Sequence, residues 1–480
     1  MKQVIRRFLV LGTSSLFTQV IAFGALAVAA RRVTPADLGS YTVALSIVTF
    51  ISLPSSMGIT IVGTRDVAQN PGRVRQIAGE VFLLQLIVAL VGYAIILALS
   101  PVISPNHAMQ ELFPIVGLFL FTGMSFEWTL QALGEMRAIA VARVVGQVVY
   151  GALVPLLVVH GLAGMRIYAW LMSAGLALKL LLTAVFLVRA AGPPDFRVGW
   201  AALRRRWRGS LTMGYTSVML QLYGTIDQVM LGYFSTAYDA GEYAAAYRIP
   251  NALGTFTASW LAVVFPHSAA LATGDPQRLR AHSSRLITIV ALFVVPLVAC
   301  TPFVAHDLIV ASFGAQYGPA STAFTLLIVS TGLSILDGTM GTWLMGLGKD
   351  RMFARLVTVT ALLNVAINLI AIPTFGRNGA AVASIISEVL GFLIAIRGVN
   401  AALGGLAPEW GRLGRIVLAV CPAILALIVV PDSVAVWIRI PMGAAVYSVA
   451  LVVFGGVATA EIRAALGRGK PPTAEAVTSP

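Results

Sequence analysis

Apolar runs of about twenty residues recur along almost the whole chain, and they limit its fold more than any other feature. A helix of that length crosses the hydrocarbon core of a bilayer, where only helices and closed barrels satisfy their own backbone hydrogen bonds. A membrane barrel would instead show segments of about ten residues with alternating polarity. Charged residues make up only 11% of this 480-residue chain, against about 25% in soluble proteins. The chain is therefore predicted to be an all-α polytopic membrane protein.

About fourteen of these runs are long enough to span a bilayer. The first run follows Lys2, Arg6 and Arg7, as the apolar segment of a secretory signal does, but its length favours a retained transmembrane helix. The predicted spans are residues 8–30, 41–63, 80–100, 112–133, 141–160, 167–188, 210–233, 249–271, 286–305, 321–346, 353–372, 379–396, 413–430 and 436–460.

The basic residues alternate between successive connections, which indicates the orientation of the chain. With a cytoplasmic amino terminus, most of the 33 Lys and Arg residues fall in cytoplasmic segments. We therefore predict a multi-pass protein of the bacterial inner membrane with both termini in the cytoplasm. The formal net charge of +14 then reflects this bias, so nucleic acid is not an expected partner.

The first half of the sequence resembles the second. A simple shift aligns Gln19 with Gln221 and Gly39 with Gly241, and the first six spans then fall on the next six. Repeats of this kind are typical of transporters, which bind substrate between two halves and rock them against each other. We therefore predict two six-helix lobes related by a pseudo-twofold repeat.

A basic connection separates the two halves, and its interspersed Trp200 and Trp207 suit a helix lying along anionic headgroups. The chain ends in a polar, proline-containing segment that is predicted to be disordered. The predicted parts are a first lobe at 1–188, an amphipathic cytoplasmic connection at 189–209, a second lobe at 210–398, two additional transmembrane helices at 399–460 and a cytoplasmic tail at 461–480.

Ionisable residues inside spans cost about 2.5–3.5 kcal/mol each to insert, so they usually face a cavity or a partner. Asp227 is the most deeply placed of them. It is a candidate for coupling to Na⁺ or H⁺, and the competing interpretation is a polar contact or salt bridge that fixes two helices. The other residues of this kind are Glu127, Lys179, Asp337 and Glu388.

Several polar residues are candidates for substrate binding. Asn364 and Asn368 lie one helical turn apart and offer amides to sugar hydroxyls, or to a neighbouring helix. Arg31 and Arg248 lie at predicted outer ends of spans, where guanidinium groups could pair with diphosphate or hold the rim together. The remaining candidates are Lys179, Gln19 and Gln221.

The sequence contains no recognisable catalytic or metal-binding constellation. Its five histidines are scattered, and no long soluble loop is available to house an active site. The two cysteines, Cys300 and Cys421, lack both zinc-ligand spacing and a disulfide framework, and we expect both to be buried packing residues. An enzyme is therefore not expected, and neither is a bound cofactor.

Three segments resemble a known family. They are residues 30–41 (ARRVTPADLGSY), residues 227–232 and 241–248 (DQVMLG and GEYAAAYR), and residues 368–376 with 379–384 (NLIAIPTFG and GAAVAS). The chain resembles the polysaccharide repeat-unit flippases of the exporter superfamily that also contains multidrug and toxin extruders (MATE) and lipid II flippases. Arg248 also matches an arginine near the start of the eighth helix of lipid II flippases, whereas their basic residues in the first two helices have no counterpart here.

The resemblance implies a MATE-like fold with two six-helix lobes around a central cavity. The implied cargo is an undecaprenyl-diphosphate-linked oligosaccharide, which is flipped to the outer leaflet for O-antigen, capsule or exopolysaccharide assembly. Expected partners are this lipid-linked glycan, membrane lipids and other polysaccharide assembly proteins. The alternatives are a multidrug or cation antiporter of the same fold, a lipid II flippase, a structural membrane protein and a membrane enzyme.

Overall fold

The fold is known from a computed structural model, which describes residues 2–56, 58–274, 276–406 and 408–456. Every regular element in these ranges is a helix, which confirms the predicted all-α class. Eleven helices are long and apolar enough to cross a membrane, so the chain is a multi-pass membrane protein. The predicted tail at 461–480 and the end of the last predicted span, 457–460, lie outside the described residues.

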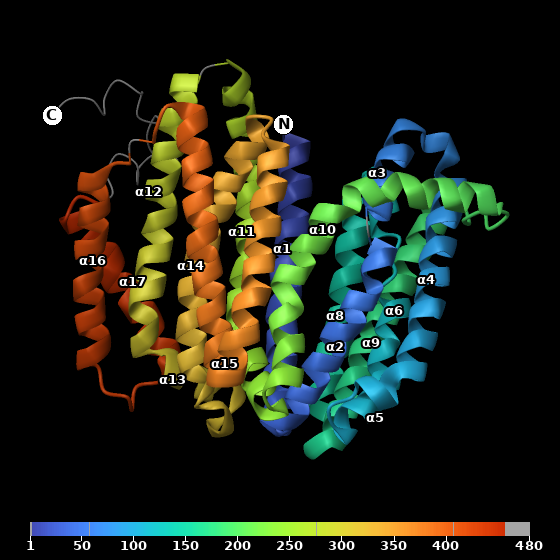
Figure 1. Ribbon diagram of the computed structural model, residues 1–480, viewed down its shortest axis with the longest axis horizontal. Helices are drawn as coiled ribbons and strands as arrows, with labels where there is room; N and C mark the ends of the chain where they lie inside the picture. The colour runs from blue at the N-terminus through green and yellow to red at the C-terminus, as the bar shows by residue number, and fades with distance from the viewer. Residues whose placement is uncertain (1, 57, 275, 407, 457–480) are drawn as a thin grey trace. The chain divides into compact units, whose positions relative to one another are not determined.

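The helices follow one another with short connections (Figure 1). The first ten α-helices are α1 (Lys2–Ala30), α2 (Pro35–Ser56), α3 (Ile59–Gln69), α4 (Val74–Ile103), α5 (His107–Gly117), α6 (Phe119–Thr122), α7 (Glu127–Ala132), α8 (Met136–Leu157), α9 (Gly161–Ala191) and α10 (Trp200–Phe234). They are followed by α11 (Ala237–Gly274), α12 (Pro276–Cys300), α13 (Ala305–Phe313), α14 (Ala320–Gly346), α15 (Asp350–Leu403), α16 (Trp410–Val429) and α17 (Val436–Val453). Three 3₁₀ turns lie at Pro71–Arg73, Thr301–Phe303 and Ala315–Tyr317.

Glycines and short breaks divide several predicted spans. The span at 41–63 is split by Gly58, whose φ of 69° is left-handed, and the span at 112–133 consists of α5, α6 and α7. The spans at 353–372 and 379–396 both lie in α15, which is broken at Gly376. The number of fourteen spans stays a prediction, because eleven candidate spans are identified among the described residues.

The chain divides into two compact units, and each is described by itself. The first unit comprises Met1–Ala252, Ser312–Tyr317 and Val357–Ala383, and the second contains the other described residues. The first unit thus combines the first lobe with parts of the second lobe predicted from the sequence repeat. The predicted lobe boundaries themselves stay a prediction.

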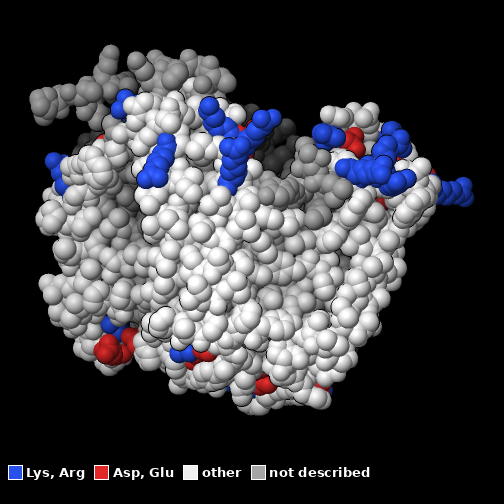
Figure 2. Space-filling model, viewed as in Figure 1, with Lys and Arg blue, Asp and Glu red and all other residues white. Residues whose placement is uncertain are grey.

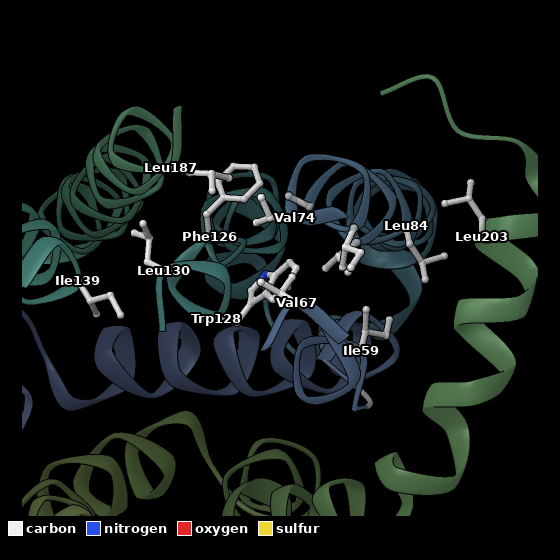
Figure 3. Packing of buried hydrophobic residues seen from close by; sticks show 13 residues of the cluster. Ile59, Val67, Val74, Leu84, Phe126, Trp128, Leu130, Ile139, Leu187 and Leu203 are labelled. Atoms are coloured by element: carbon white, nitrogen blue, oxygen red, sulfur yellow. The ribbon is translucent and has the colours of Figure 1, made fainter. Parts of the chain in front are cut away.

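A hydrophobic cluster in the first unit anchors the start of α10. Leu203 lies in this cluster together with Ile59, Trp128 and Leu187 from α3, α7 and α9 (Figure 3). Trp200 is exposed, so this part of α10 has one buried face and one outward face, as its amphipathic sequence predicts.

Arg206 fixes the same part of α10 by charge. Its guanidinium donates to Glu80 Oε2 at 2.6 and 2.9 Å and to Asp66 Oδ2 at 3.2 Å, and its side chain is almost fully buried. One cation shared between two carboxylates explains why this arginine faces the protein rather than the lipid headgroups. From Trp200 onward, the basic connection therefore continues into the predicted span at 210–233 as one α-helix.

Charged side chains gather near the helix ends on the face shown in Figure 2, and the surface between them is uncharged. Large apolar side chains such as Leu90, Val91 and Val102 of α4 are exposed on the first unit. Such a surface suits the hydrocarbon core of a bilayer. Cys421 of α16 is likewise exposed, and Cys300 is half-buried, so the expectation that both cysteines are buried is wrong. The outward face of a membrane helix is apolar too, so an apolar run does not show that a residue is buried.

The break in α15 depends on Gly376, and we predict that Gly376→Ala destabilises the first unit. Gly376 has φ 54° and ψ −133°, and an added Cβ would lie 2.8 Å from Asp239 Oδ2. Asp239 must stay in place because its Oδ1 accepts from Arg377 Nη1 at 2.5 Å. We expect a loss of about 2–3 kcal/mol, seen as a lower midpoint of thermal unfolding in detergent.

Gly348→Ala is the matched control. Gly348 also has a positive φ, of 69°, but an added Cβ there meets nothing within 4 Å. This substitution measures backbone strain alone. Equal unfolding midpoints for the two variants would show that the crowding against Asp239 has no part in the effect.

Candidate functional site

A polar cavity of about 460 Å³ lies within the first unit. Residues of α1, α2, α8, α9, α10 and α11 line it. The described residues that line it include no carboxylate, although the Glu127 carboxylate lies directly behind two of its cations. Its polar lining consists of Tyr41, Thr42, Ser46, Thr49, Arg143, Gln147, Tyr150, Tyr168, Lys179, Gln221, Thr225, Gln228, Tyr247, Arg248 and Asn251.

Helical periodicity places three of these side chains on one wall. Arg143, Gln147 and Tyr150 follow one another at spacings of four and three residues, so α8 turns all three toward the cavity. The glycines Gly146 and Gly175 let α8 and α9 approach closely, because a Cβ on Gly146 would lie 2.7 Å from the Gly175 carbonyl oxygen. The helices α8 and α9 are therefore closely packed beside these polar side chains.

Glu127 of α7 holds two cations at one end of the cavity. It accepts from Arg143 Nη2 at 2.7 Å and from Arg143 Nε at 3.0 Å, a bidentate pair. Lys179 Nζ lies 3.8 Å from Glu127 Oε1. One carboxylate between two cations leaves this end with a net positive charge.

Three tyrosines and Arg248 form the other end. The rings of Tyr41 and Tyr150 each meet that of Tyr168 edge to face, with centroid distances of 5.5 and 5.8 Å. Arg248 lines the same cavity as these tyrosines, and its positive charge acts on the hydroxyl groups of all three. In the part of the chain that the structure describes, no ion pair joins Arg248 to a carboxylate.

Asp227 lies in a separate buried cluster between α10, α11 and α15. Its Oδ2 accepts from the Tyr243 hydroxyl at 2.9 Å, and its Oδ1 accepts from Asn368 Nδ2 at 2.6 Å. Asn368 Nδ2 also donates to Asn364 Oδ1 at 3.0 Å. Asn368 Oδ1 is buried without a hydrogen-bond partner among the described residues, so this cluster contains one acceptor oxygen whose hydrogen-bonding capacity is unused.

The structure brings some of the predicted site residues together and separates others. Lys179, Gln221 and Arg248 line the cavity, whereas Gln19 of α1 is not among the lining residues. Arg31 is exposed, and its Nε donates to the Ser312 carbonyl oxygen at 3.3 Å. Asn364 and Asn368, predicted to contact the glycan, are fully buried beside Asp227. The functional roles of all these residues stay predictions.

Arg143 and the tyrosines of the cavity are not among the site residues predicted from the sequence. Arg143 lies near the start of a predicted span, where a basic residue is expected to face the cytoplasm. The signal that could have found it is its spacing to Gln147 and Tyr150, which makes a polar stripe along an otherwise apolar helix. Tyr41 and Tyr168 could be found only by knowing which helices are neighbours.

Comparison with known proteins gives relatives of low identity. The chain is 26% identical over 166 residues to the probable low-salt glycan biosynthesis flippase Agl15 of Haloferax volcanii, and 25% identical over 191 residues to the probable flippase AglR of the same organism. These segments cover 34% and 39% of this chain, and only 35% and 40% of the two relatives.

Solved structures share the fold. The lipid II flippase MurJ in an inward closed conformation aligns with a TM-score of 0.70 over 96% of this chain and all of its own, at 13% identity. An inward-facing multidrug resistance MATE family transporter aligns with a TM-score of 0.59 over 82% of this chain and 96% of its own, at 17% identity. The predicted MATE-like fold is thereby confirmed.

A family model described as "Polysaccharide biosynthesis protein" matches residues 28–322, which is more than half of the chain. The match includes α2, α8, α9, α10 and α11, which line the cavity, but of α1 it includes only the end of the helix, after the lining residues Ala22 and Leu26. The relatives and structures named above are flippases and transporters rather than enzymes. The chain therefore belongs to this family of polysaccharide biosynthesis proteins.

Proposed function

We propose that the protein flips an undecaprenyl-diphosphate-linked oligosaccharide across the bacterial inner membrane for surface polysaccharide assembly. The observation that carries this proposal is the lining of the cavity, which combines cations, amides and tyrosines without a carboxylate among its described residues. Cations suit a diphosphate, and amides and tyrosine hydroxyls suit sugar hydroxyls. The family and the names of the two Haloferax volcanii relatives support the flippase part of this proposal.

The cavity accounts for the difficult part of such a reaction, which is moving a charged, hydroxylated head group through hydrocarbon. Arg143 and Lys179 offset the diphosphate charge, and Gln147 and Gln221 replace water around the sugars. The polyprenyl tail stays in lipid and needs no polar site. Alternating access of the cavity to the two leaflets completes the transfer.

The orientation belongs to the same proposal. With both termini in the cytoplasm, the basic start of α10 lies against the anionic inner leaflet, where Trp200 and the neighbouring arginines suit headgroups. The lipid-linked glycan and membrane lipids are then the immediate partners, and the assembly proteins that supply and polymerise the glycan act on either side.

Asp227 is proposed as the coupling residue for Na⁺ or H⁺. Rotation of the Asn368 amide would turn its spare Oδ1 toward the carboxylate, which gives a cation oxygen ligands from two helices. Alternatively, a proton on Asp227 Oδ1 would be donated to the same oxygen. Either event changes the charge of a buried group and so can bias one conformation over another.

Asp227→Asn is expected to lower surface polysaccharide to about a tenth of the wild-type amount at matched expression. Asparagine keeps the shape of the side chain but removes the titratable, cation-binding carboxylate. The return of the protein to its inward-facing conformation then loses its driving force. Asp350→Asn is the control, because Asp350 is an exposed carboxylate at the start of α15. A wild-type amount of surface polysaccharide in the Asp227→Asn variant would contradict the proposed coupling role of Asp227.

Deletion of the gene tests the proposed function directly. We expect loss of one surface glycan and accumulation of its complete repeat unit on the lipid carrier at the cytoplasmic face. Unchanged glycan, in a strain without a second flippase, together with altered drug or cation tolerance, would support the antiporter instead. Turnover of the lipid-linked sugar without translocation would indicate an enzyme.

A further inference from the structure

The helices α2 and α11 cross at one end of the cavity, which is the outer end in the proposed orientation. A Cβ on Gly39 would overlap the Ala237 carbonyl oxygen and come within 2.7 Å of the Gly241 nitrogen, so the two backbones are in contact there. The cavity begins just beyond this contact on both helices, where Tyr41 and Ala244 line it. Along these two helices, the crossing therefore separates the cavity from the outer side.

The two helix starts are related by the sequence repeat. At the start of α2 the Asp37 backbone nitrogen donates to Thr34 Oγ1 at 3.2 Å. At the start of α11 the Asp239 backbone nitrogen donates to Thr236 Oγ1 at 3.0 Å. The repeat fails one residue after the paired glycines, where α2 has a serine and α11 has Glu242. The α11 side of the crossing therefore carries one carboxylate more than the α2 side.

Glu242 is fully buried and shares its counterion with a second carboxylate. Arg377 Nε lies 2.8 Å from Glu242 Oε2, and Arg377 Nη1 donates to Asp239 Oδ1 at 2.5 Å. Asp239 also accepts from the Ser235 hydroxyl at 2.6 Å, whereas neither oxygen of Glu242 accepts a well-aligned hydrogen bond from the described residues. The cluster therefore holds one excess negative charge, and Glu242 is the less well solvated of its two carboxylates.

The groups around Glu242 decide how readily it takes up a proton. The charged and titratable ones belong to four elements, and they are Arg377 of α15, Tyr238 and Asp239 of α11, Tyr317 of the last 3₁₀ turn and Asp37 of α2. Glu242 lies before the predicted span at 249–271, and burial raises the pKa of its carboxyl to about 7. Arg377 lowers this pKa, Asp239 raises it and the Tyr238 hydroxyl lowers it.

This pKa links proton binding to the crossing. When the two helices separate, water reaches Glu242 and the pKa of its carboxyl returns toward the ordinary value of 4.5. A group whose pKa is raised in the closed arrangement stabilises that arrangement in acid, and the stabilisation is lost as the pH rises through about 7. Closure of the crossing is therefore coupled to the uptake of a proton.

We propose that Glu242 is a proton-binding site on the outer side, which holds the crossing of α2 and α11 closed when it is protonated and weakens it when it is ionised. This inference rests on the proposed flippase function and orientation, and it adds regulation by the pH outside the membrane. The proton enters and leaves on the same side. Glu242 therefore controls outward opening and supplies no driving force, in contrast to the role proposed for Asp227.

The test measures how fast a membrane-impermeant maleimide reaches the cavity from outside in right-side-out membrane vesicles. The reporter is Leu45→Cys, one turn from Tyr41 on the cavity-lining face of α2, in a full-length chain with Cys300→Ser and Cys421→Ser. Rates are measured from about pH 5.5 to about pH 8.5, with and without Glu242→Gln, which keeps this side chain neutral. Both proteins are compared at the same pH, so the pH dependence of the thiol cancels.

The labelling rate of the reporter protein, divided by that of its Glu242→Gln form, should rise about tenfold or more from about pH 5.5 to about pH 8.5. Glu111→Gln is the matched control. Glu111 of α5 is also paired with an arginine, Arg166, but it takes no part in the crossing. This control should keep the pH dependence of the reporter protein.

A ratio that stays constant over this range, or an absence of labelling from outside at every pH, would overturn the proposal and leave the flippase function standing. A rising ratio in a protein that moves no lipid-linked glycan would support the proton site and remove the flippase function. Should Glu242→Gln fail to fold, Ser433→Cys in the exposed connection between α16 and α17 replaces it as the reference. The labelling rate of Leu45→Cys relative to Ser433→Cys should then rise about tenfold or more, and a constant value would contradict the proposal.

Discussion

Gly39→Ala and Gly241→Ala are each expected to prevent the first unit from folding normally. These two glycines, which the sequence repeat aligns with each other, face each other where α2 crosses α11. A Cβ on Gly39 would overlap the Ala237 carbonyl oxygen and come within 2.7 Å of the Gly241 nitrogen. A Cβ on Gly241 would overlap the Pro35 carbonyl oxygen and lie 3.0 Å from the Gly39 nitrogen.

Both clashes are with backbone atoms, which cannot rotate away as a side chain can. The helices would have to separate, and the packing around Tyr41 and Tyr243, both buried one half-turn further along, would be lost with the contact. We expect a cost of about 3 kcal/mol or more for either substitution, enough to remove most of a marginally stable native state. The measurement is the yield of monodisperse protein in detergent and its midpoint of thermal unfolding.

Gly24→Ala is the matched control, because Gly24 lies inside α1 and an added Cβ there meets nothing within 4 Å. Alanine favours a helix over glycine by up to about 1 kcal/mol, so this variant should be as stable as the wild type or more stable. Normal yield and stability of Gly39→Ala would mean that α2 and α11 do not cross as closely as described.

The double substitution Arg143→Gln, Lys179→Gln is expected to abolish flipping of a polyprenyl-diphosphate probe in proteoliposomes. Each charge-assisted hydrogen bond contributes about 1.5–3 kcal/mol, so loss of two should weaken binding about a hundredfold or more. The change also leaves Glu127, which is mostly buried, as an unpaired negative charge beside the cavity. An unpaired buried carboxylate both repels the diphosphate and destabilises the fold.

A triple variant that adds Glu127→Gln separates these two effects. It removes all three charges of the cluster together, and replacing a whole buried ion-pair group costs much less than breaking it. We expect the triple variant to regain most of the wild-type thermal stability while its transport stays lost. Recovery of transport with stability would show that the cations serve only to neutralise Glu127.

The sequence determines the class of this protein because hydrophobicity is a local property. Runs of about twenty apolar residues have one stable arrangement in a bilayer, so the membrane helices follow from composition alone. The cost of burying charge in hydrocarbon likewise marks Asp227 and Lys179 as residues with a cavity or a partner. The structure gives Asp227 the partners Tyr243 and Asn368, and it places Lys179 at the cavity.

Only the tertiary structure decides which of the ionisable residues within the spans contact one another. Glu127 and Arg143 belong to different helices, and nothing in the order of residues shows that α7 and α8 turn them toward each other. Arg31 resembles Arg248 in the sequence pattern, yet it donates to a backbone carbonyl, whereas Arg248 lines the cavity. The contact between Gly39 and Gly241 has the same origin, since helix crossing depends on backbone approach in three dimensions. A sequence records how costly each side chain is to bury, whereas the packing of the helices decides which neighbour offsets that cost.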